Sequence, residues 1–353
     1  MTLEEFLEEW NNDSEQVMVH TSGSTGKPKP MWVEKRRMEA SARITCDFLG
    51  LKKGDTALLC MSLDYIAGKM MVVRSLVRNF KLIVVEPTGN PLANVAASKI
   101  DFAAMVPMQV YNSLQVPQER ERLKQIKHLI IGGGAIDEAM ASELKDFPNY
   151  VWSTYGMTET LSHIALRRLN GPEASEWYKP FPSVEISRND DGCLVIDAPQ
   201  VCSERLVTND IVEISEAGFR IIGRKDNVIC SGGIKIQAEE VERILKPYVH
   251  DPFLITKRKD QKFGEIVVMM VEDRGKATGR RAELGNERKE EREERESLKT
   301  RLQSLCREHL PKYWQPRAFV FVEKLPMTET GKPARKQAEE LATQCFSCFF
   351  SVY

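Results

Sequence analysis

Between residues 33 and 155, short apolar runs alternate with helical stretches, and this alternation constrains the fold more than any other feature of the chain. The expected strands are 56–61, 82–85, 101–106, 129–131 and 150–154. Continuous apolar strands of this length, separated by helices, are typical of a parallel sheet that is covered on both faces. The sequence therefore predicts an α/β fold whose large N-terminal domain contains a doubly wound, mainly parallel sheet.

The pattern changes in the rest of the chain. Residues 171–223 contain short strands separated by turns, which predicts a small β-rich subdomain. From residue 224 a hairpin-like stretch, a helix, two strands and a late helix predict a smaller α+β domain. We therefore assign residues 1–223 to an N-terminal domain and residues 224–353 to a C-terminal domain.

Charge and apolar content exclude several classes of protein. The 353 residues include 50 Lys and Arg against 51 Asp and Glu, so no overall positive field would hold nucleic acid. No apolar run approaches the ~18–20 residues that span a bilayer, and the acidic N-terminus is unlike a secretory signal. The eight cysteines and five histidines form no strong metal-site spacing. We expect a cytoplasmic protein without a nucleic-acid partner, a membrane span or structural zinc.

Residues 21–29 are dense in groups that bind anions. Hydroxyl groups, glycines and two lysines within nine residues supply hydrogen-bond donors, close backbone approach and positive charge, which a polyphosphate site needs. A flexible Ser/Gly-rich linker is the alternative, but Pro28 stiffens this segment. The segment is not a Walker A loop, because only two residues separate Gly23 from Gly26 and a proline follows Lys27.

The segment TSGSTGKPK at 21–29 resembles the signature phosphate loop of the adenylate-forming, or AMP-binding, enzymes. Further stretches resemble motifs of this family in the same order: YGMTET at 155–160, TND at 208–210, GRKDNVICSGG at 223–233 and TGKPARK at 330–336. The resemblance implies an acid–CoA ligase that uses ATP, Mg2+ and CoA. In this family a carboxylate attacks the α-phosphate of ATP, and the acyl-adenylate is then converted to a thioester.

The resemblance also implies which residues bind the nucleotide. The phosphates of ATP would be held by Thr21, Ser22, Gly23, Ser24, Thr25, Gly26 and Lys27. The adenine would lie against Gly132, Gly133, Gly134 and Tyr155, with the ring of Tyr155 stacked on it, and Gly156 would belong to the same nucleotide site. The ribose would be bound by Asp210 and Arg224. Asn209 replaces the usual glycine before this aspartate, and we expect it to keep a left-handed turn there.

Three residues are expected to act on the phosphates and the carboxylate. Glu159 resembles the Mg2+ ligand of the family and Thr158 its phosphate-contacting threonine, and a carboxylate suits Mg2+. The alternative is that Thr158 and Glu159 only open a helix, although a helix N-terminus beside ATP is compatible with both roles. Lys332 resembles the catalytic lysine that touches the substrate carboxylate and the α-phosphate. Without its motif, it would be a solvated surface lysine.

Asp226 resembles the hinge of this family, about which the C-terminal domain rotates between the two half-reactions. The resemblance therefore implies a mobile C-terminal domain. Gly232 and Gly233 resemble the glycines beside which the pantetheine arm of CoA enters. The thiol belongs to CoA, so the reaction needs no cysteine nucleophile from the protein.

The acyl site offers small residues, one aromatic ring and a few polar groups: Tyr65, Lys69, Ser162 and His163. This mixture favours a compact aromatic acid over a fatty chain, with a second anionic group that meets Lys69 or Arg74. The stretches YGMTETLSHIALRRLNG and SGGIKI are similar to the o-succinylbenzoate–CoA ligase branch of the family, in menaquinone synthesis. His163 is equally well explained as a packing histidine.

The sequence is also compatible with two other functions. An enzyme that adenylates another aryl or acyl acid, and passes it to a carrier protein, is the nearest alternative. A non-catalytic nucleotide-binding module is less compatible with the presence of Glu159, Asp210 and Lys332 together. Full-size members of the family carry a further subdomain before the phosphate loop. We therefore expect either a more open acyl pocket or a homo-oligomer in which a second subunit covers it.

Overall fold

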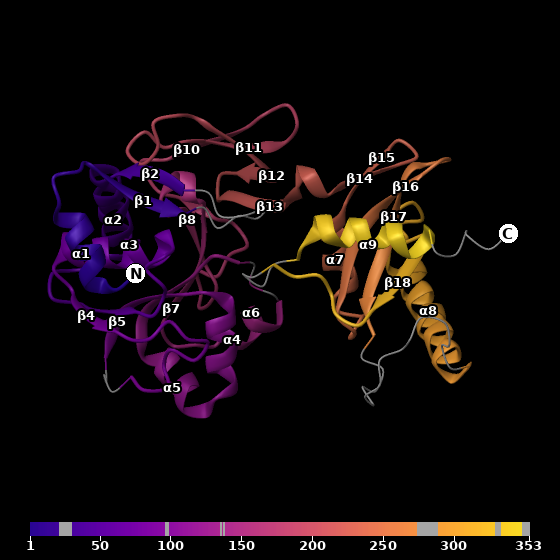
Figure 1. Ribbon diagram of the computed structural model, residues 1–353, viewed down its shortest axis with the longest axis horizontal. Helices are drawn as coiled ribbons and strands as arrows, with labels where there is room; N and C mark the ends of the chain where they lie inside the picture. The colour runs from indigo at the N-terminus through magenta and orange to yellow at the C-terminus, as the bar shows by residue number, and fades with distance from the viewer. Residues whose placement is uncertain are drawn as a thin grey trace. The chain divides into compact units, whose positions relative to one another are not determined.

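The computed structural model describes residues 1–20, 30–95, 99–134, 136, 138–273, 289–328 and 333–347 (Figure 1). The chain divides into two compact units. The first contains Met1–Thr208 and Glu213–Arg220, and the second contains Asn209–Val212 and Ile221–Tyr353. These units reflect only how the chain packs into compact bodies. The boundary between the functional domains, which we place at residue 224, remains a prediction.

The first unit is built on a seven-stranded sheet in the order β4-β3-β5-β6-β7-β8-β9. Its strands are β3 (Thr56–Leu59), β4 (Lys81–Val84), β5 (Ile100–Met105), β6 (Ile126–Ile131), β7 (Tyr150–Gly156), β8 (His163–Arg168) and β9 (Lys179–Pro180). The first five strands in this order pair in parallel, whereas β8 and β9 add an antiparallel edge. The predicted α/β fold with a mainly parallel sheet is confirmed. The sequence pattern did not identify β8 as a strand.

Helices cover both faces of this sheet (Figure 1). They are α1 (Leu3–Asn11), α2 (Lys35–Leu49), α3 (Ile66–Arg78), α4 (Pro107–Gln115), α5 (Pro117–Gln125) and α6 (Glu138–Leu144). Alternate residues in or directly after the strands, such as Leu58, Cys60, Leu129 and Ile131, point to one face, where they share a core with α4, α5 and α6. Pro107 and Pro117 each occupy the first helical turn, where the missing N–H costs nothing.

A separate two-stranded sheet brackets the predicted phosphate loop. Strand β1 (Gln16–His20) pairs antiparallel with β2 (Pro30–Glu34), from Gln16 opposite Glu34 to His20 opposite Pro30. Residues 21–29 connect these strands and lie outside the described residues. The side chains of Val17 and Val19 are fully buried, so β1 is anchored in the core on one face.

A four-stranded sheet follows, in the order β10-β11-β12-β13. Its strands are β10 (Glu185–Arg188), β11 (Cys193–Asp197), β12 (Leu206–Ser215) and β13 (Gly218–Arg224). The division between the two compact units falls within β12 and β13.

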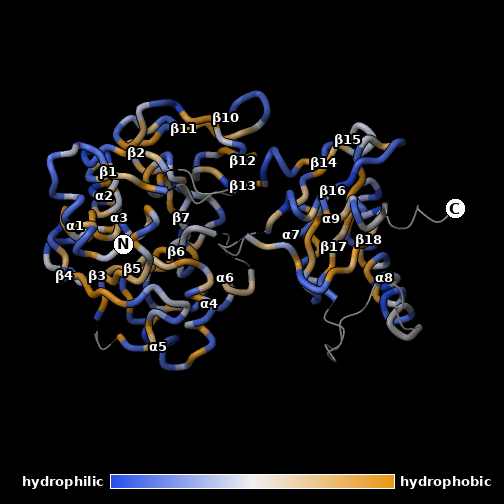
Figure 2. The backbone as a smooth tube through the Cα atoms, viewed as in Figure 1, coloured by the Kyte–Doolittle hydropathy of each residue, from blue (hydrophilic) through white to orange (hydrophobic). Residues whose placement is uncertain are grey.

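The second unit packs helices on a mixed sheet. The strands are β14 (Val228–Ser231), β15 (Ile234–Gln237), β16 (Phe253–Asp260), β17 (Gly264–Glu272) and β18 (Ala318–Val322), and the helices are α7 (Ala238–Leu245), α8 (Lys289–His309) and α9 (Arg335–Ser347). Hydrophobic residues gather along β16 and β17 (Figure 2), with α7 and α8 contributing to one core and α9 to another. None of the helices in the described parts of the chain is long and apolar enough to cross a membrane.

Candidate active site

Two predicted nucleotide-binding segments follow neighbouring strands of the main sheet. Gly132–Gly134 comes directly after β6 and Met157–Glu159 directly after β7, and these strands pair in parallel with Ile131 opposite Ser153. The carboxyl ends of parallel strands lie at one edge of a sheet, which is where ligands of open α/β sheets bind. The fold therefore brings the two segments to the same edge.

Two glycines at this edge are required by the backbone, Gly156 by close packing and Gly133 by its conformation. A Cβ added to Gly156 would lie 2.3 Å from the carbonyl oxygen of Ser162 and 2.5 Å from the Cα of His163. The register of β7 and β8 shifts at Tyr155 and Gly156, so this glycine permits the bulge that turns the chain back. Gly133 has φ +78°, a conformation that other residues rarely adopt.

Tyr155 lies in an aromatic cluster of the first unit. Its side chain is buried, with its ring 5.0 Å from that of Phe219 in an edge-to-face arrangement and 5.9 Å from that of Tyr178. Such pairs hold a ring in a defined orientation. The predicted stacking of Tyr155 on adenine stays a prediction.

Thr158 and Glu159 belong to a short 3-10 helix, η1 (Thr158–Thr160), whose turn is held by Thr160. The hydroxyl of Thr160 accepts a hydrogen bond from the N–H of Met157 at 3.1 Å. Glu159 is exposed, and among the described residues its carboxylate has no ion-pair partner. Its oxygen atoms are therefore available to a cation, which fits the predicted contact with Mg2+.

A chain of hydrogen-bonded polar side chains connects α3 to α2 through the two residues Ser162 and His163. Arg74 on α3 donates to the Ser162 hydroxyl at 2.6 Å, and that hydroxyl lies 3.2 Å from Nδ1 of His163. Nε2 of His163 lies 3.1 Å from the Thr45 hydroxyl, which donates to the carbonyl oxygen of Ser41. If each group donates to the next, the His163 ring is neutral with its proton on Nε2. Both ring nitrogens are then satisfied.

Arg74 is unusual within this chain of groups. It is 2% exposed, its Nε has no hydrogen-bond partner, and no described carboxylate pairs with it. Burial lowers the pKa of Arg74 to about 10. A buried guanidinium normally pairs with an anion, because desolvation of the charge is costly. Of the two cations that the sequence offers for a second anionic group, Arg74 is the one that lacks a counter-ion among the described residues.

The other predicted substrate contacts are placed differently. Tyr65 precedes α3 and is 44% exposed. Lys69 is 3% exposed, and its ammonium lies 2.7 Å from the Met18 carbonyl oxygen and 3.3 Å from the Glu9 carboxylate. The roles of Tyr65, Lys69, Ser162 and His163 in substrate binding remain predictions. The sequence pattern did not identify Glu9 or Thr45.

We expect buried histidines to make the protein less stable in mild acid. Burial and the charge of Arg74 hold the pKa of His163 well below its usual range, and burial lowers that of His128 to about 4. Below pH ~6.5 the unfolded chain therefore binds more protons than the folded one, so the free energy of unfolding falls as pH falls. Urea titrations at pH 7, 6 and 5 measure this slope.

The matched variants are His163→Asn and His250→Asn, since His250 is exposed. His163→Asn should reduce the slope by up to ~1.4 kcal/mol per pH unit, the limit for one proton. His250→Asn should leave it unchanged. An unchanged slope in His163→Asn would contradict a neutral buried imidazole.

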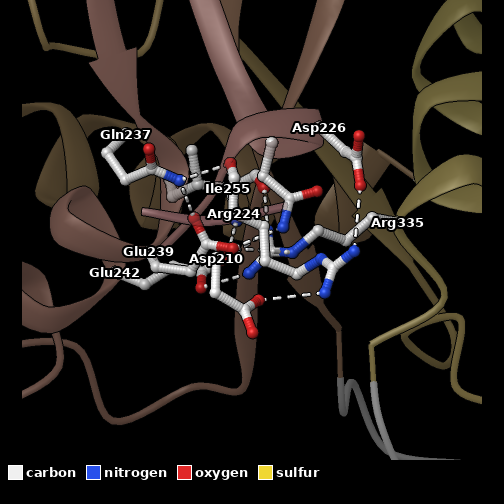
Figure 3. A network of polar contacts seen from close by, with 9 residues as sticks. Asp210, Arg224, Asp226, Gln237, Glu239, Glu242, Ile255 and Arg335 are labelled. Atoms are coloured by element: carbon white, nitrogen blue, oxygen red, sulfur yellow. Dashed lines mark hydrogen bonds and ion pairs between the residues drawn. The ribbon is translucent and has the colours of Figure 1, made fainter. Parts of the chain in front are cut away.

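The predicted ribose and hinge residues form one network in the second unit (Figure 3). Arg224 contacts Asp210 at 3.0 Å through one guanidinium nitrogen and Asp226 at 3.0 Å through the other. Asn209 donates to the same Asp226 carboxylate at 3.2 Å. The expected left-handed turn at Asn209 is wrong, because residues 208–210 lie within the extended strand β12 and Asn209 does not have positive φ.

The network extends toward α9. Gln237 donates to the carbonyl oxygen of Arg224 at 2.9 Å and also to Glu239. Arg335 contacts Glu242 at 2.8 Å and donates to the carbonyl oxygen of Ile255 at 2.8 Å (Figure 3). Arg335 follows Lys332 by three residues within the TGKPARK stretch, which is the only sequence signal that pointed to it.

The remaining predicted site residues are the two glycines beside the expected CoA path, the phosphate loop and Lys332. Gly232 and Gly233 connect β14 to β15 with φ +59° and +83°, the positive values of a tight hairpin turn. Lys332 and residues 21–29 lie outside the described residues.

Comparison with known proteins shows the family of this chain. The sequence profile of the AMP-binding enzyme family matches residues 4–197, and that of the AMP-binding enzyme C-terminal domain matches residues 256–332. The chain belongs to the AMP-binding enzyme family. It is an AMP-forming acid–CoA ligase, and such enzymes use ATP, Mg2+ and CoA.

Several AMP-binding enzymes resemble the chain over most of its length. The 2-succinylbenzoate–CoA ligase of Listeria monocytogenes is 24% identical over 95% of this chain and 72% of its own. An acyl-CoA synthetase (AMP-forming)/AMP-acid ligase II-like protein from Dyadobacter fermentans is 34% identical, with TM-score 0.62, over 95% of this chain and 92% of its own. The o-succinylbenzoate coenzyme A synthetase of Bacillus subtilis, in complex with ATP and magnesium, is 22% identical with TM-score 0.69, over 91% of this chain and 69% of its own.

Proposed function

We propose that this AMP-binding enzyme joins o-succinylbenzoate to CoA through an acyl-adenylate, as a step of menaquinone biosynthesis. The observation that carries the proposal is Arg74, a buried guanidinium without a described carboxylate partner. Several relatives carry the name of this ligase, which supports the same substrate.

The chemistry of the substrate matches this cation. o-Succinylbenzoate carries two carboxylates on a compact aromatic ketone. One carboxylate is adenylated, so the other needs a counter-charge inside the acyl site. Arg74 would supply that charge, with a fork of N–H donors that suits a carboxylate. A fatty acid has no second anion and would leave the guanidinium uncompensated.

The remaining assignments belong to the same proposal. Glu159 would bind Mg2+ and Thr158 a phosphate, while Asp210 and Arg224 would bind the ribose. Residues 21–29 would hold the β- and γ-phosphates, and Lys332 would act on the carboxylate and the α-phosphate. The C-terminal domain would then turn about Asp226 to admit CoA beside Gly232 and Gly233.

The test is ATP–pyrophosphate exchange with a panel of carboxylates, followed by thioester formation with CoA. We expect exchange with o-succinylbenzoate, and weak exchange with benzoate, fatty acids and amino acids. Strong exchange with fatty or amino acids, and none with o-succinylbenzoate, would overturn the proposed substrate. Exchange without thioester formation would instead favour transfer to a carrier protein.

A further inference from the structure

One backbone position in the first unit is held by two charged side chains from different helices. Met18 lies in β1, the strand that ends at His20 directly before the predicted phosphate loop. The Glu9 carboxylate, on α1, accepts a hydrogen bond from the Met18 N–H at 3.2 Å. The Lys69 ammonium, on α3, donates to the Met18 carbonyl oxygen at 2.7 Å. Both polar groups of one residue are therefore bound by side chains.

The two side chains also bind each other. Nζ of Lys69 lies 3.3 Å from Oε2 of Glu9, while the other oxygen of this carboxylate binds Met18. Lys69 is 3% exposed, and its ammonium lies 5.3 Å from the centroid of the buried Phe6 ring. Screening by water is weak in such a position, so these charge-assisted contacts are strong.

These contacts stabilise a strand that has few backbone partners of its own. Strand β1 has only β2 as a described strand partner, and an isolated two-stranded sheet is marginally stable. Backbone groups on its other edge need partners. Glu9 and Lys69 supply them at Met18, three residues before Thr21.

We propose that Glu9 and Lys69 are positioning residues for ATP, which hold β1 in place so that the phosphate loop starts from a fixed position. This inference rests on the proposed phosphate-binding role of residues 21–29. It gives Lys69 a task other than binding the carboxylate substrate, since two of its three donors are engaged by Met18 and Glu9. It also gives α1 a role in ATP binding, through Glu9.

The experiment compares Glu9→Ala with Glu8→Ala. Glu8 is exposed on the same helix, so its removal changes the charge equally without touching Met18. We expect Glu9→Ala to raise the Kd for MgATP about tenfold, or ~1.4 kcal/mol, and Glu8→Ala to leave it unchanged. Glu9→Gln keeps an oxygen for the Met18 N–H but loses the charge, so its Kd for MgATP should lie between those of Glu9→Ala and Glu8→Ala. The KM for the carboxylate should stay the same in all three variants.

Two results with the Glu9→Ala variant would overturn the inference. If Glu9→Ala only lowers the melting temperature and the folded protein binds MgATP normally, the contact is merely structural. If the KM for the carboxylate rises instead, Lys69 serves the acyl site. Binding of MgATP is measured without any carboxylate, so a wild-type protein that binds MgATP but ignores o-succinylbenzoate overturns the proposed substrate alone. A wild-type protein that does not bind MgATP overturns both proposals.

Discussion

Replacing Lys332 by alanine is expected to reduce ATP–pyrophosphate exchange by roughly 10²–10³-fold, the effect of removing one group that stabilises charge in a transition state. The resemblance places this lysine on the substrate carboxylate and the α-phosphate, where negative charge accumulates as the acyl-adenylate forms. MgATP is held mainly by other residues, so its Kd should change little. Exchange measured at saturating ATP and carboxylate separates the chemical step from binding.

The control for this variant is Lys336→Ala, which removes an exposed lysine in α9, four residues further along. It should exchange like the wild type. A second readout is the reaction of preformed acyl-adenylate with CoA. Lys332→Ala should perform this half-reaction normally, because the lysine is expected to withdraw before CoA enters. Equal loss in both half-reactions would contradict a role confined to adenylation.

Replacing Arg74 by methionine is expected to lower kcat/KM for o-succinylbenzoate by about 100-fold, since truncating one partner of a buried charge pair costs ~2–5 kcal/mol. The loss should be specific for the second carboxylate. An analogue in which a methyl group replaces the carboxylate that is not adenylated should be used by Arg74→Met at least as well as by the wild type. The measurement is thioester formation with the two acids for both proteins.

Stability distinguishes this role from a structural one. Arg74 has no described carboxylate partner, so methionine removes a desolvated charge without leaving an acid unpaired. The melting temperature of Arg74→Met should therefore be unchanged or higher. Arg78→Met is the control, because Arg78 lies one turn further along α3 and pairs with Asp47. It should leave the preference between the two acids unchanged, and an equal loss with both acids in Arg74→Met would argue against carboxylate recognition.

Much of the fold could be predicted because its signals are local. The central parallel strands are buried on both faces and therefore read as short apolar runs. The run at 56–61 predicted β3 closely, and the run at 129–131 predicted the second half of β6. Strand β8 was not predicted because its sequence, His163–Arg168, contains polar and charged residues whose burial depends on distant partners. The turn expected at Asn209 was wrong for a related reason. Pairing within its sheet holds that segment extended, whatever conformations asparagine permits.

The nucleotide motifs could likewise be read from the chain, since a glycine-rich loop needs its residues close together in sequence. Networks that join distant residues could not. Arg335 lies 93 positions from Glu242, and Glu9 lies 60 positions from Lys69. No local pattern links such pairs, because they meet only when separate elements pack.

The sequence by itself determined the family, the parallel sheet and two candidate cations on one helix, Lys69 and Arg74. It left open which of them meets a substrate anion. Five residues of an α-helix turn through about 500°, so the two side chains point roughly 140° apart. Only the tertiary structure decided what each one faces: Lys69 meets Glu9 and β1, whereas Arg74 is buried beside Ser162 with no described counter-ion. The physical reason is that the helix sets the directions of its side chains, but the elements packed around it set their partners.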